Sequence, residues 1–322
     1  MLAKKRCNMP MLKVGALREE FFAATQGRVR FDEPMRLHTT FHIGGPAQIW
    51  AEPQDPEELK KLLRLATEGS LPVTVVSGGA NLLVRDEGIP GLVLHLGHPG
   101  FQGFRRSDEG FVVGAGLSIE WLIRRATEAS VSGVEFLAGV PGRVGGAVRM
   151  NAGTHDDEGK SHSFSDVVRS VTLMDPEGRI ETVSVEQAGF GYRSSKLSGR
   201  IVLGATLDLS PDDPETIAQR VKRLWSFKRD TQDWTAPSVG CIFKNPAGGE
   251  AAGRLIDQAG MKGFRIGGAA VSRIHANFIM NLGSARAADV LALIEEVRSR
   301  VRRKSKVELE LEVQLLPREG AG

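Results

Sequence analysis

The sequence predicts a mixed α and β fold that divides into two or three domains. Two observations support this prediction. Helical patterns with one apolar face alternate with short β-type runs, and glycine-rich turns separate them. The chain of 322 residues, with 41% hydrophobic and 25% charged residues, is also long and apolar enough to bury a large core.

In the first half of the chain, extended and helical patterns alternate. Asp55 is placed to cap a helix that Gly69 ends, and Ser118 is placed to cap a second helix with the same apolar spacing. We expect the glycine-rich run at residues 139–153 to be a loop lying close against another group. The predicted strands of this half cover residues 47–51, 72–76, 91–96 and 111–113.

In the second half, residues 167–174 and 179–185 form a predicted hairpin around an Asp-Pro-Glu-Gly turn. The other predicted elements are a strand at 201–209, a helix from Asp213 to about Lys228, a helix capped by Ser284 and an alternating strand at 307–315. The glutamates of this last strand, Glu308, Glu310 and Glu312, share one face, and we expect solvent to cover at least two of them.

Composition narrows the range of functions. The net charge of +3 comes from 42 basic and 39 acidic residues, which does not indicate the concentrated basic face of a nucleic-acid-binding protein. Cys7 and Cys241 are the only cysteines, so we expect no disulfide framework and no metal site. With no signal peptide and no run of about 20 apolar residues, we expect a cytoplasmic protein without a membrane span. The first ten residues read as a flexible extension.

A glycine turn follows the strand at residues 72–76. Its sequence, from Ser77 to Leu82, presents successive backbone N–H groups in a nest that suits a phosphate. It is neither a Walker loop nor a dinucleotide-binding motif, because the residues after it look extended. Alone it would more often be a simple turn. The second glycine run at 139–153 favours a ligand, since two such loops suggest backbone approaching a large flat molecule from two sides.

Cys241 is a lone thiol with Gly240 before it and Lys244 and Asn245 after it. A free cysteine is most often a small buried hydrophobe, but these neighbours indicate a polar setting. A thiol with a pKa near roughly 8.5 can donate a proton at neutral pH, and nucleophilic attack is the weaker alternative because spacing identifies no histidine partner. Arg193 gains a role only if it faces a carboxylate.

Taken together, these segments resemble the bacterial UDP-N-acetylenolpyruvoylglucosamine reductase family, the MurB flavoenzymes. The ordered set of matches is specific, although each alone is weak, and it runs from about residue 36 to residue 316. The matching pieces are residues 39–45, 77–83, 139–147, 151–153, 191–194, 240–246, 252–256, 275–278 and 309–313.

The resemblance implies an α+β fold with a two-subdomain FAD-binding region of the vanillyl-alcohol-oxidase type, followed by a smaller substrate-binding domain. Residues 1–35 would lead into FAD-binding subdomains at about 36–96 and 97–229, and residues 230–322 would bind substrate, with a boundary near 230–237. The residues implied to bind FAD are Ser77, Gly78, Gly79, Ala80, Asn81, Leu82, Gly139, Pro141, Gly142, Gly145, Gly146, Ala147, Asn151 and Gly153.

The implied reaction is NADPH-dependent reduction of an enolpyruvyl ether to UDP-N-acetylmuramate for peptidoglycan synthesis. NADPH and the UDP-sugar would use one pocket in turn. By resemblance, Arg193 and Glu312 polarise the substrate carboxylate, and Cys241 donates the proton where the family usually has serine. The thiol would preserve this role, but it would also expose the site to oxidation or alkylation. The residues implied to bind substrate are Tyr192, Lys244, Asn245, Lys262 and Arg265.

The segment between Arg193 and Cys241 is short and contains no tyrosine, so the chain looks like the shorter form of the family, which lacks the loop that closes over the substrate. How this form shields its pocket stays open, as does the choice between NADPH and NADH. We expect a monomer, although the sequence does not determine the oligomeric state. Two alternatives to the reductase are a flavin oxidase that uses oxygen and an inactive nucleotide-binding relative that regulates wall synthesis.

Overall fold

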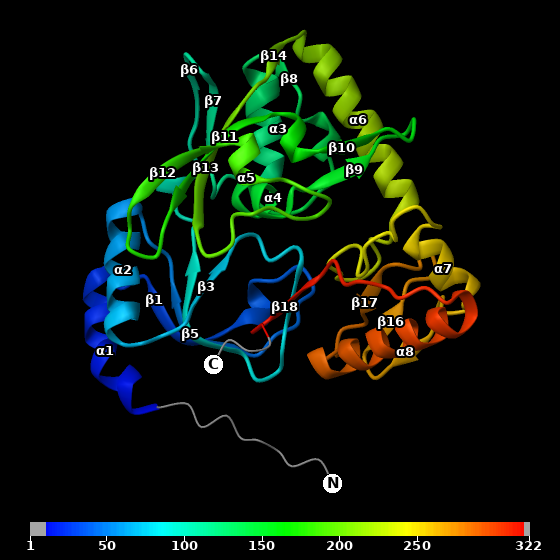
Figure 1. The fold of residues 1–322 in the computed structure, drawn as a ribbon, viewed down its shortest axis with the longest axis horizontal. Helices are drawn as coiled ribbons and strands as arrows, with labels where there is room; N and C mark the ends of the chain where they lie inside the picture. Colours follow the sequence, from blue (N-terminus) through cyan, green and yellow to red (C-terminus); the bar gives the residue numbers. More distant parts are fainter. Residues whose placement is uncertain (1–10, 319–322) are drawn as a thin grey trace.

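The computed structural model describes residues 11–318, with side chains from Leu17 onward, so the predicted flexible extension lies outside the described residues. Figure 1 shows three units: a first unit in blue and cyan, a second in green, and a third in yellow to red. No helix within residues 11–318 is long and apolar enough to cross a membrane.

The first unit is a four-stranded sheet covered by two helices. Its strand order is β1 (Val29–Pro34), β2 (Pro46–Ala51), β5 (Ile89–His95) and β3 (Val73–Val76), with only the β1–β2 pair antiparallel. The helices are α1 (Met11–Ala24) and α2 (Pro56–Glu68). Asp55 caps α2 as predicted, because its Oδ1 accepts the backbone N–H of Glu58 at 2.8 Å. Strand β1 lies within residues 1–35, which were predicted to precede the FAD-binding region. This part of the predicted lead-in therefore belongs to the sheet.

The second unit is a five-stranded antiparallel sheet with helices packed on it. The strand order is β12 (Ile180–Ser184), β11 (Val168–Met174), β13 (Ile201–Leu207), β7 (Gly110–Gly114) and β6 (Phe104–Ser107), which confirms the predicted hairpin. The helices of this unit are α3 (Ile119–Glu128), α4 (Val144–Met150), α5 (Val185–Ala188) and α6 (Pro214–Thr231). Two small strand pairs join β8 (Val131–Ser132) to β14 (Ser210–Pro211) and β9 (Gly153–His155) to β10 (Ser161–Ser163).

The prediction of a loop at residues 139–153 is wrong in part, because α4 occupies its centre. Two glycines in its first turn hid the helical pattern, since glycine is a poor helix former. Tertiary packing overrides this preference: Val144 and Val148 are fully buried, and a side chain at Gly145 would crowd Ala115, with its Cβ 3.0 Å from that of Ala115. The helix ends at Asn151, which adopts the left-handed conformation with φ 42°.

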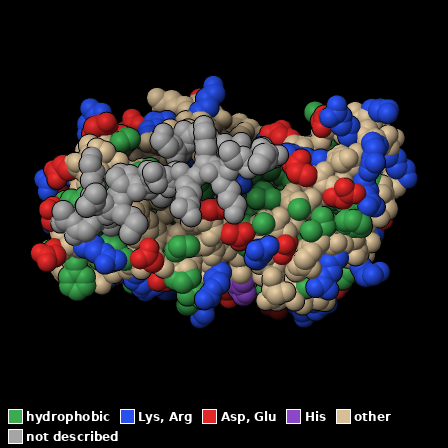
Figure 2. All heavy atoms as spheres, turned by 90° about the horizontal axis from the view of Figure 1, so that it is seen from below, with side chains coloured by type: hydrophobic (Ala, Val, Ile, Leu, Met, Phe, Trp, Pro, Cys, Tyr) green, Lys and Arg blue, Asp and Glu red, His purple; other side chains and the backbone are tan. Residues whose placement is uncertain are grey.

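The third unit packs a small sheet of β15 (Arg265–Ile266), β16 (Ala269–Val271) and β17 (Ile279–Asn281) against α7 (Ala252–Gln258) and α8 (Ala287–Ser305). The predicted cap at Ser284 is wrong, because α8 begins after Arg286. Its first free N–H groups are satisfied from the first unit instead, since the carboxylate of Asp86 accepts those of Ala287 and Ala288 at 2.9 and 3.1 Å. Figure 2 shows basic side chains gathered at the outer end of this unit, where the last turn of α8 carries Arg302, Arg303 and Lys304.

The predicted strand at residues 307–315 is mostly irregular. Only β18 (Gln314–Leu316) is regular, and it pairs in parallel with β4 (Leu82–Val84) of the first unit. The alternation of apolar and polar residues nevertheless predicts which side chains are buried. Leu309 and Val313 are buried in the core of the third unit, whereas Glu308 and Glu310 are exposed. The backbone cannot stay in one sheet because it crosses from the third unit to the first.

Short 3₁₀ turns complete the described chain and connect the larger elements. They are η1 (Met35–Leu37), η2 (Pro99–Phe101), η3 (Glu135–Leu137) and η4 (Phe164–Asp166).

Candidate active site

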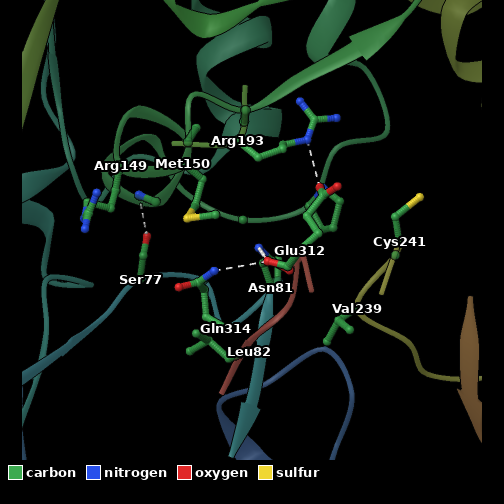
Figure 3. Close-up of a pocket in the computed structure, with 18 of the residues that line it drawn as sticks. Ser77, Asn81, Leu82, Arg149, Met150, Arg193, Val239, Cys241, Glu312 and Gln314 are labelled. Carbon is green, nitrogen blue, oxygen red and sulfur yellow. Dashed lines mark hydrogen bonds and ion pairs between the residues drawn. The ribbon is translucent and has the colours of Figure 1, made fainter. Parts of the chain in front are cut away.

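A cavity of about 1220 Å³ lies where the three units meet. The first unit contributes the turn at residues 77–82, the second contributes the 139–147 segment and the turn around Arg193, and the third contributes Cys241 and its neighbours. Glu312 enters from the segment that returns to the first unit. Figure 3 shows Glu312 in the middle of this wall, with Arg193 on one side, Asn81 on another and Cys241 across from them.

Arg193 and Glu312 form an ion pair inside the cavity. The Nε of Arg193 donates to Oε1 of Glu312 at 2.8 Å, and the two side chains are only 21% and 15% exposed. Arg193 adopts a left-handed backbone with φ 52° in the tight turn from Gly191 to Ser194, which aims its side chain across the cavity. Burial raises the pKa of the Glu312 carboxyl, although the Arg193 guanidinium opposes this rise.

Cys241 is half-buried in the opposite wall. Burial, together with the negative charge of Glu312, raises the pKa of its thiol to about 12, so the thiol is protonated at neutral pH. This suits a proton donor rather than a nucleophile. It also opposes the expectation that the site is readily alkylated, because the thiolate is the reactive form.

Asn277 fixes the strand-like segment that carries Cys241. Its side-chain Oδ1 accepts the N–H of Phe243 at 3.0 Å, and its Nδ2 donates to the carbonyl of Phe243 at 2.8 Å. The same buried amide opposes the rise in the pKa of the Cys241 thiol. Asn277 had appeared only as part of the matching piece at 275–278, and nothing in its spacing indicated this contact.

The two glycine-rich segments meet at the cavity. A Cβ on Gly78 would lie 2.6 Å from the Cα of Gly142, so the two backbones can approach only because side chains are absent. Among the described residues, the backbone N–H groups of Gly78, Gly79 and Ala80 donate to no protein acceptor. Free N–H groups in such a turn form an anion-binding nest, so the residues present fit the pyrophosphate of FAD.

The cavity wall includes nearly all of the predicted cofactor residues, namely Ser77, Gly78, Gly79, Ala80, Asn81, Leu82, Gly139, Pro141, Gly142, Gly145, Gly146, Ala147 and Gly153. Asn151 is the exception, because it is buried beneath the wall. Its amide donates to the carbonyl of Gly191 at 3.1 Å and accepts the N–H of Ser165 at 2.9 Å. It therefore supports the turn that holds Arg193 rather than lining the cavity.

Three of the five predicted substrate residues, Tyr192, Asn245 and Lys262, line the cavity, and two do not. Lys244 points the other way along its extended segment, and its Nζ binds Glu310 at 2.5 Å. Arg265 lies on β15 and donates from Nε to the carbonyl of Gly267 at 2.7 Å. Both predictions are wrong in placing these cations on the cavity, since sequence position alone does not show which way a side chain points.

Lys228 and His275 are among the cavity-lining residues that the sequence analysis did not select. Lys228 continues the buried stripe of α6 after Ile217 and Leu224, so helical spacing could have identified it. His275 has a buried Nδ1 with no hydrogen-bond partner among the described residues, and burial lowers its pKa, which favours the neutral imidazole at neutral pH. No pattern in the sequence indicated His275.

Comparison with known proteins gives matches along most of the chain. A family model described as the C-terminal domain of UDP-N-acetylenolpyruvoylglucosamine reductase matches residues 232–316, and a FAD-binding-domain model matches residues 47–184. The reductase of that name from Heliobacterium modesticaldum is 43% identical over 90% of this chain and 91% of its own length. The Bacillus subtilis reductase is 38% identical, covering 90% of this chain and 94% of its own.

A solved structure supports the same relationship. The crystal structure of the reductase from Thermus caldophilus covers 90% of this chain and 99% of its own, with a TM-score of 0.76 and 40% identity. These matches confirm the predicted α+β fold class, in which a FAD-binding domain precedes the C-terminal domain of the reductase family.

Proposed function

Because the chain belongs to the UDP-N-acetylenolpyruvoylglucosamine reductase family and is an FAD-dependent oxidoreductase, we propose that it reduces UDP-N-acetylglucosamine enolpyruvate to UDP-N-acetylmuramate. NADPH is the proposed hydride donor. The observation that carries this proposal is the convergence of Arg193, Glu312 and Cys241 on one glycine-lined cavity.

FAD, when bound, supplies the hydride that reaches the terminal enol carbon of the substrate. The nest at residues 77–82 is suited to its pyrophosphate, and the 139–147 segment is suited to enclosing the rest of the molecule. In this proposal NADPH and the UDP-sugar occupy the same cavity one after the other. We assign the FAD-binding subdomains to residues 36–96 and 97–229 and substrate binding to residues 230–322, with residues 1–35 leading in.

Hydride addition leaves negative charge on the neighbouring carbon and carboxylate of the substrate, and the Arg193–Glu312 pair is arranged to accommodate it. Arg193 uses Nε for Glu312, which leaves its terminal N–H groups for a carboxylate. Because burial raises the pKa of Glu312, this carboxyl can hold a proton and donate a hydrogen bond when the substrate charge is close.

Cys241 then supplies the proton to the carbon that carries the charge. A carbon next to a carboxylate in its enolate form is a much stronger base than a thiolate, so donation is favourable even from a thiol with a pKa of about 12. Asn277 can stabilise the thiolate left behind, since its amide acts to lower the pKa of the thiol. The raised pKa also keeps the proton on Cys241 until the substrate needs it.

Tyr192 is the best-placed residue to narrow the cavity in the absence of a tyrosine loop. Its hydroxyl accepts the backbone N–H of Asn245 at 3.4 Å, which links the second unit to the third at the cavity edge. Its ring is half exposed and lies beside Arg193, with 5.2 Å from the guanidinium carbon to the ring centre. We propose Tyr192, Asn245 and Lys262 as substrate contacts.

Rapid mixing of the FAD-loaded protein separates the two halves of the reaction. NADPH alone should bleach the flavin absorbance without oxygen, and only the enolpyruvyl sugar nucleotide should restore it quickly; NADH in a parallel series measures the donor preference. A protein that takes up no FAD, or whose flavin absorbance returns equally fast in air without substrate, would refute the proposal. The second result would identify an oxidase instead.

A further inference from the structure

Lys228 differs from every other cation of the described residues. It is the only lysine or arginine among them that is buried, with 2% of its surface exposed. Its Nζ donates to the carbonyl of Phe136 at 3.2 Å, and no carboxylate of the described residues lies within 4.0 Å of it. An ammonium group has three N–H donors, and burying its charge costs free energy unless acceptors or a negative charge replace the lost water. The carbonyl of Phe136 provides one acceptor and no negative charge.

Lys228 lines the cavity. It lies in the last turns of α6, and Gly139 gives it room, because a Cβ there would come within 3.2 Å of Cδ of Lys228. The residue shares the cavity wall with Arg193 and Glu312. The missing negative charge can therefore come from a ligand in the cavity.

The charged groups around Lys228 leave its charge unopposed. Glu135, next to Phe136 on η3, is bound by Arg220 at 2.9 Å, and Arg229 on its own helix pairs with Asp230 at 3.2 Å. Burial and the positive charge of Arg193 lower the pKa of Lys228 to about 8, so it is still mostly protonated at neutral pH.

We propose that Lys228 binds the carboxylate of the enolpyruvyl group together with Arg193, and so distinguishes the substrate from the same sugar nucleotide without that group. This inference rests on the proposed function. When Glu312 is ionised, its charge cancels that of Arg193, and Lys228 provides the positive charge that an added carboxylate needs. Other cations that line the cavity are available for the diphosphate, among them Arg254 and Lys262 of the third unit.

Equilibrium binding tests this assignment without turnover. The oxidised, FAD-loaded protein is titrated calorimetrically with UDP-N-acetylglucosamine enolpyruvate and, separately, with UDP-N-acetylglucosamine, which lacks the carboxylate. In Lys228→Met, which keeps the length and apolar stem of the side chain, the first ligand should bind about 10- to 100-fold more weakly, as expected for a lost charge-assisted hydrogen bond. Binding of the second ligand should not change.

Lys222→Met is the matched control, because Lys222 lies on the same helix but is exposed. It should bind both ligands like the wild type, and Lys228→Arg should recover part of the discrimination. Equal weakening of both ligands in Lys228→Met would overturn the proposal in favour of a diphosphate contact. Unchanged binding of both, or a loss of FAD affinity alone, would also overturn it. If the wild type binds neither ligand, the proposed function itself fails.

Discussion

Arg193 and Glu312 stand 119 positions apart in the chain and meet in an ion pair of 2.8 Å between Nε and Oε1. Each approaches from an irregular segment: Arg193 from a turn after α5, and Glu312 from the crossing between the third and first units. The Glu312 backbone is fixed on the other side, since its carbonyl accepts the side-chain amide of Asn81 at 3.0 Å. Glu312 therefore connects Arg193 to the nest at residues 77–82.

The raised pKa of Glu312 predicts a pH-dependent difference in stability between the wild type and Glu312→Gln. The folded state binds the proton of Glu312 more tightly than the unfolded chain does, so the stabilisation is fully present below the unfolded pKa and is lost as pH rises through the folded value. The wild type should therefore gain free energy of unfolding relative to Glu312→Gln as pH falls from about 7 to about 4, by about 1.4 kcal/mol per unit of pKa shift.

Urea denaturation of both proteins across this pH range measures the difference, and the exposed Glu308→Gln serves as the control. If the free energy of unfolding of the wild type minus that of Glu312→Gln stays constant with pH, or decreases as pH falls, the result would contradict a raised pKa. The same difference in the Glu308→Gln control would show that the effect comes from general charge rather than from this site.

Cys241→Ala should separate the proton step from the hydride step. Reduction of the flavin by NADPH should be nearly unchanged, whereas reduction of the enolpyruvyl substrate should slow by about 10²- to 10⁴-fold, the usual contribution of a positioned general acid. Cys241→Ser should keep much of the rate, because a hydroxyl can occupy the same position beside Asn277. Single-turnover absorbance changes measure both halves. Equal losses in the two half-reactions of Cys241→Ala would exclude a proton-donor role.

The sequence predicts the elements whose signals are local. Asp55 and Gly69 bound α2 as expected, and Ser118 caps α3, because a side-chain cap and an apolar stripe are both written within a few residues. The wrongly predicted elements depend on contacts between segments that are distant in the sequence. α8 is capped by Asp86 from another unit, and α4 forms through packing that its glycines do not reveal.

In the candidate site, too, the sequence predicts local features but not the contacts between distant segments. Spacing could not bring Arg193 and Glu312 together, and the expectation that both act on one carboxylate came only from the ordered motifs. Lys244 and Arg265 lie in the expected region but point away from the cavity. Lys228 continues the buried stripe of α6, and a buried lysine has the same helical period as its apolar neighbours, so the sequence analysis did not select it.

The thiol pKa of about 12 predicts that Cys241 resists alkylation in the folded protein. Iodoacetamide reacts with the thiolate, so modification at neutral pH should be roughly a thousandfold slower than for an ordinary cysteine and should accelerate as pH rises. A Cys7→Ser background leaves Cys241 as the only cysteine. Intact-mass measurements over time follow the reaction, and the same protein in urea is the control. Fast labelling of the folded protein at neutral pH would refute the raised pKa.

Gly78→Ala should weaken FAD binding because the two glycine-rich segments can no longer approach each other. Its new methyl group would lie 2.6 Å from the Cα of Gly142, and backbone on both sides cannot yield as a flexible side chain would.

Gly103→Ala is the matched control, since nothing lies within 4 Å of its added Cβ. FAD retained after dialysis, measured by visible absorbance, should fall at least about tenfold for Gly78→Ala, as the loss of roughly two backbone contacts to a pyrophosphate implies, and stay unchanged for Gly103→Ala. Thermal unfolding of the two FAD-free variants shows whether the fold survives. If Gly78→Ala keeps its FAD while remaining folded, the nest at residues 77–82 does not hold the pyrophosphate.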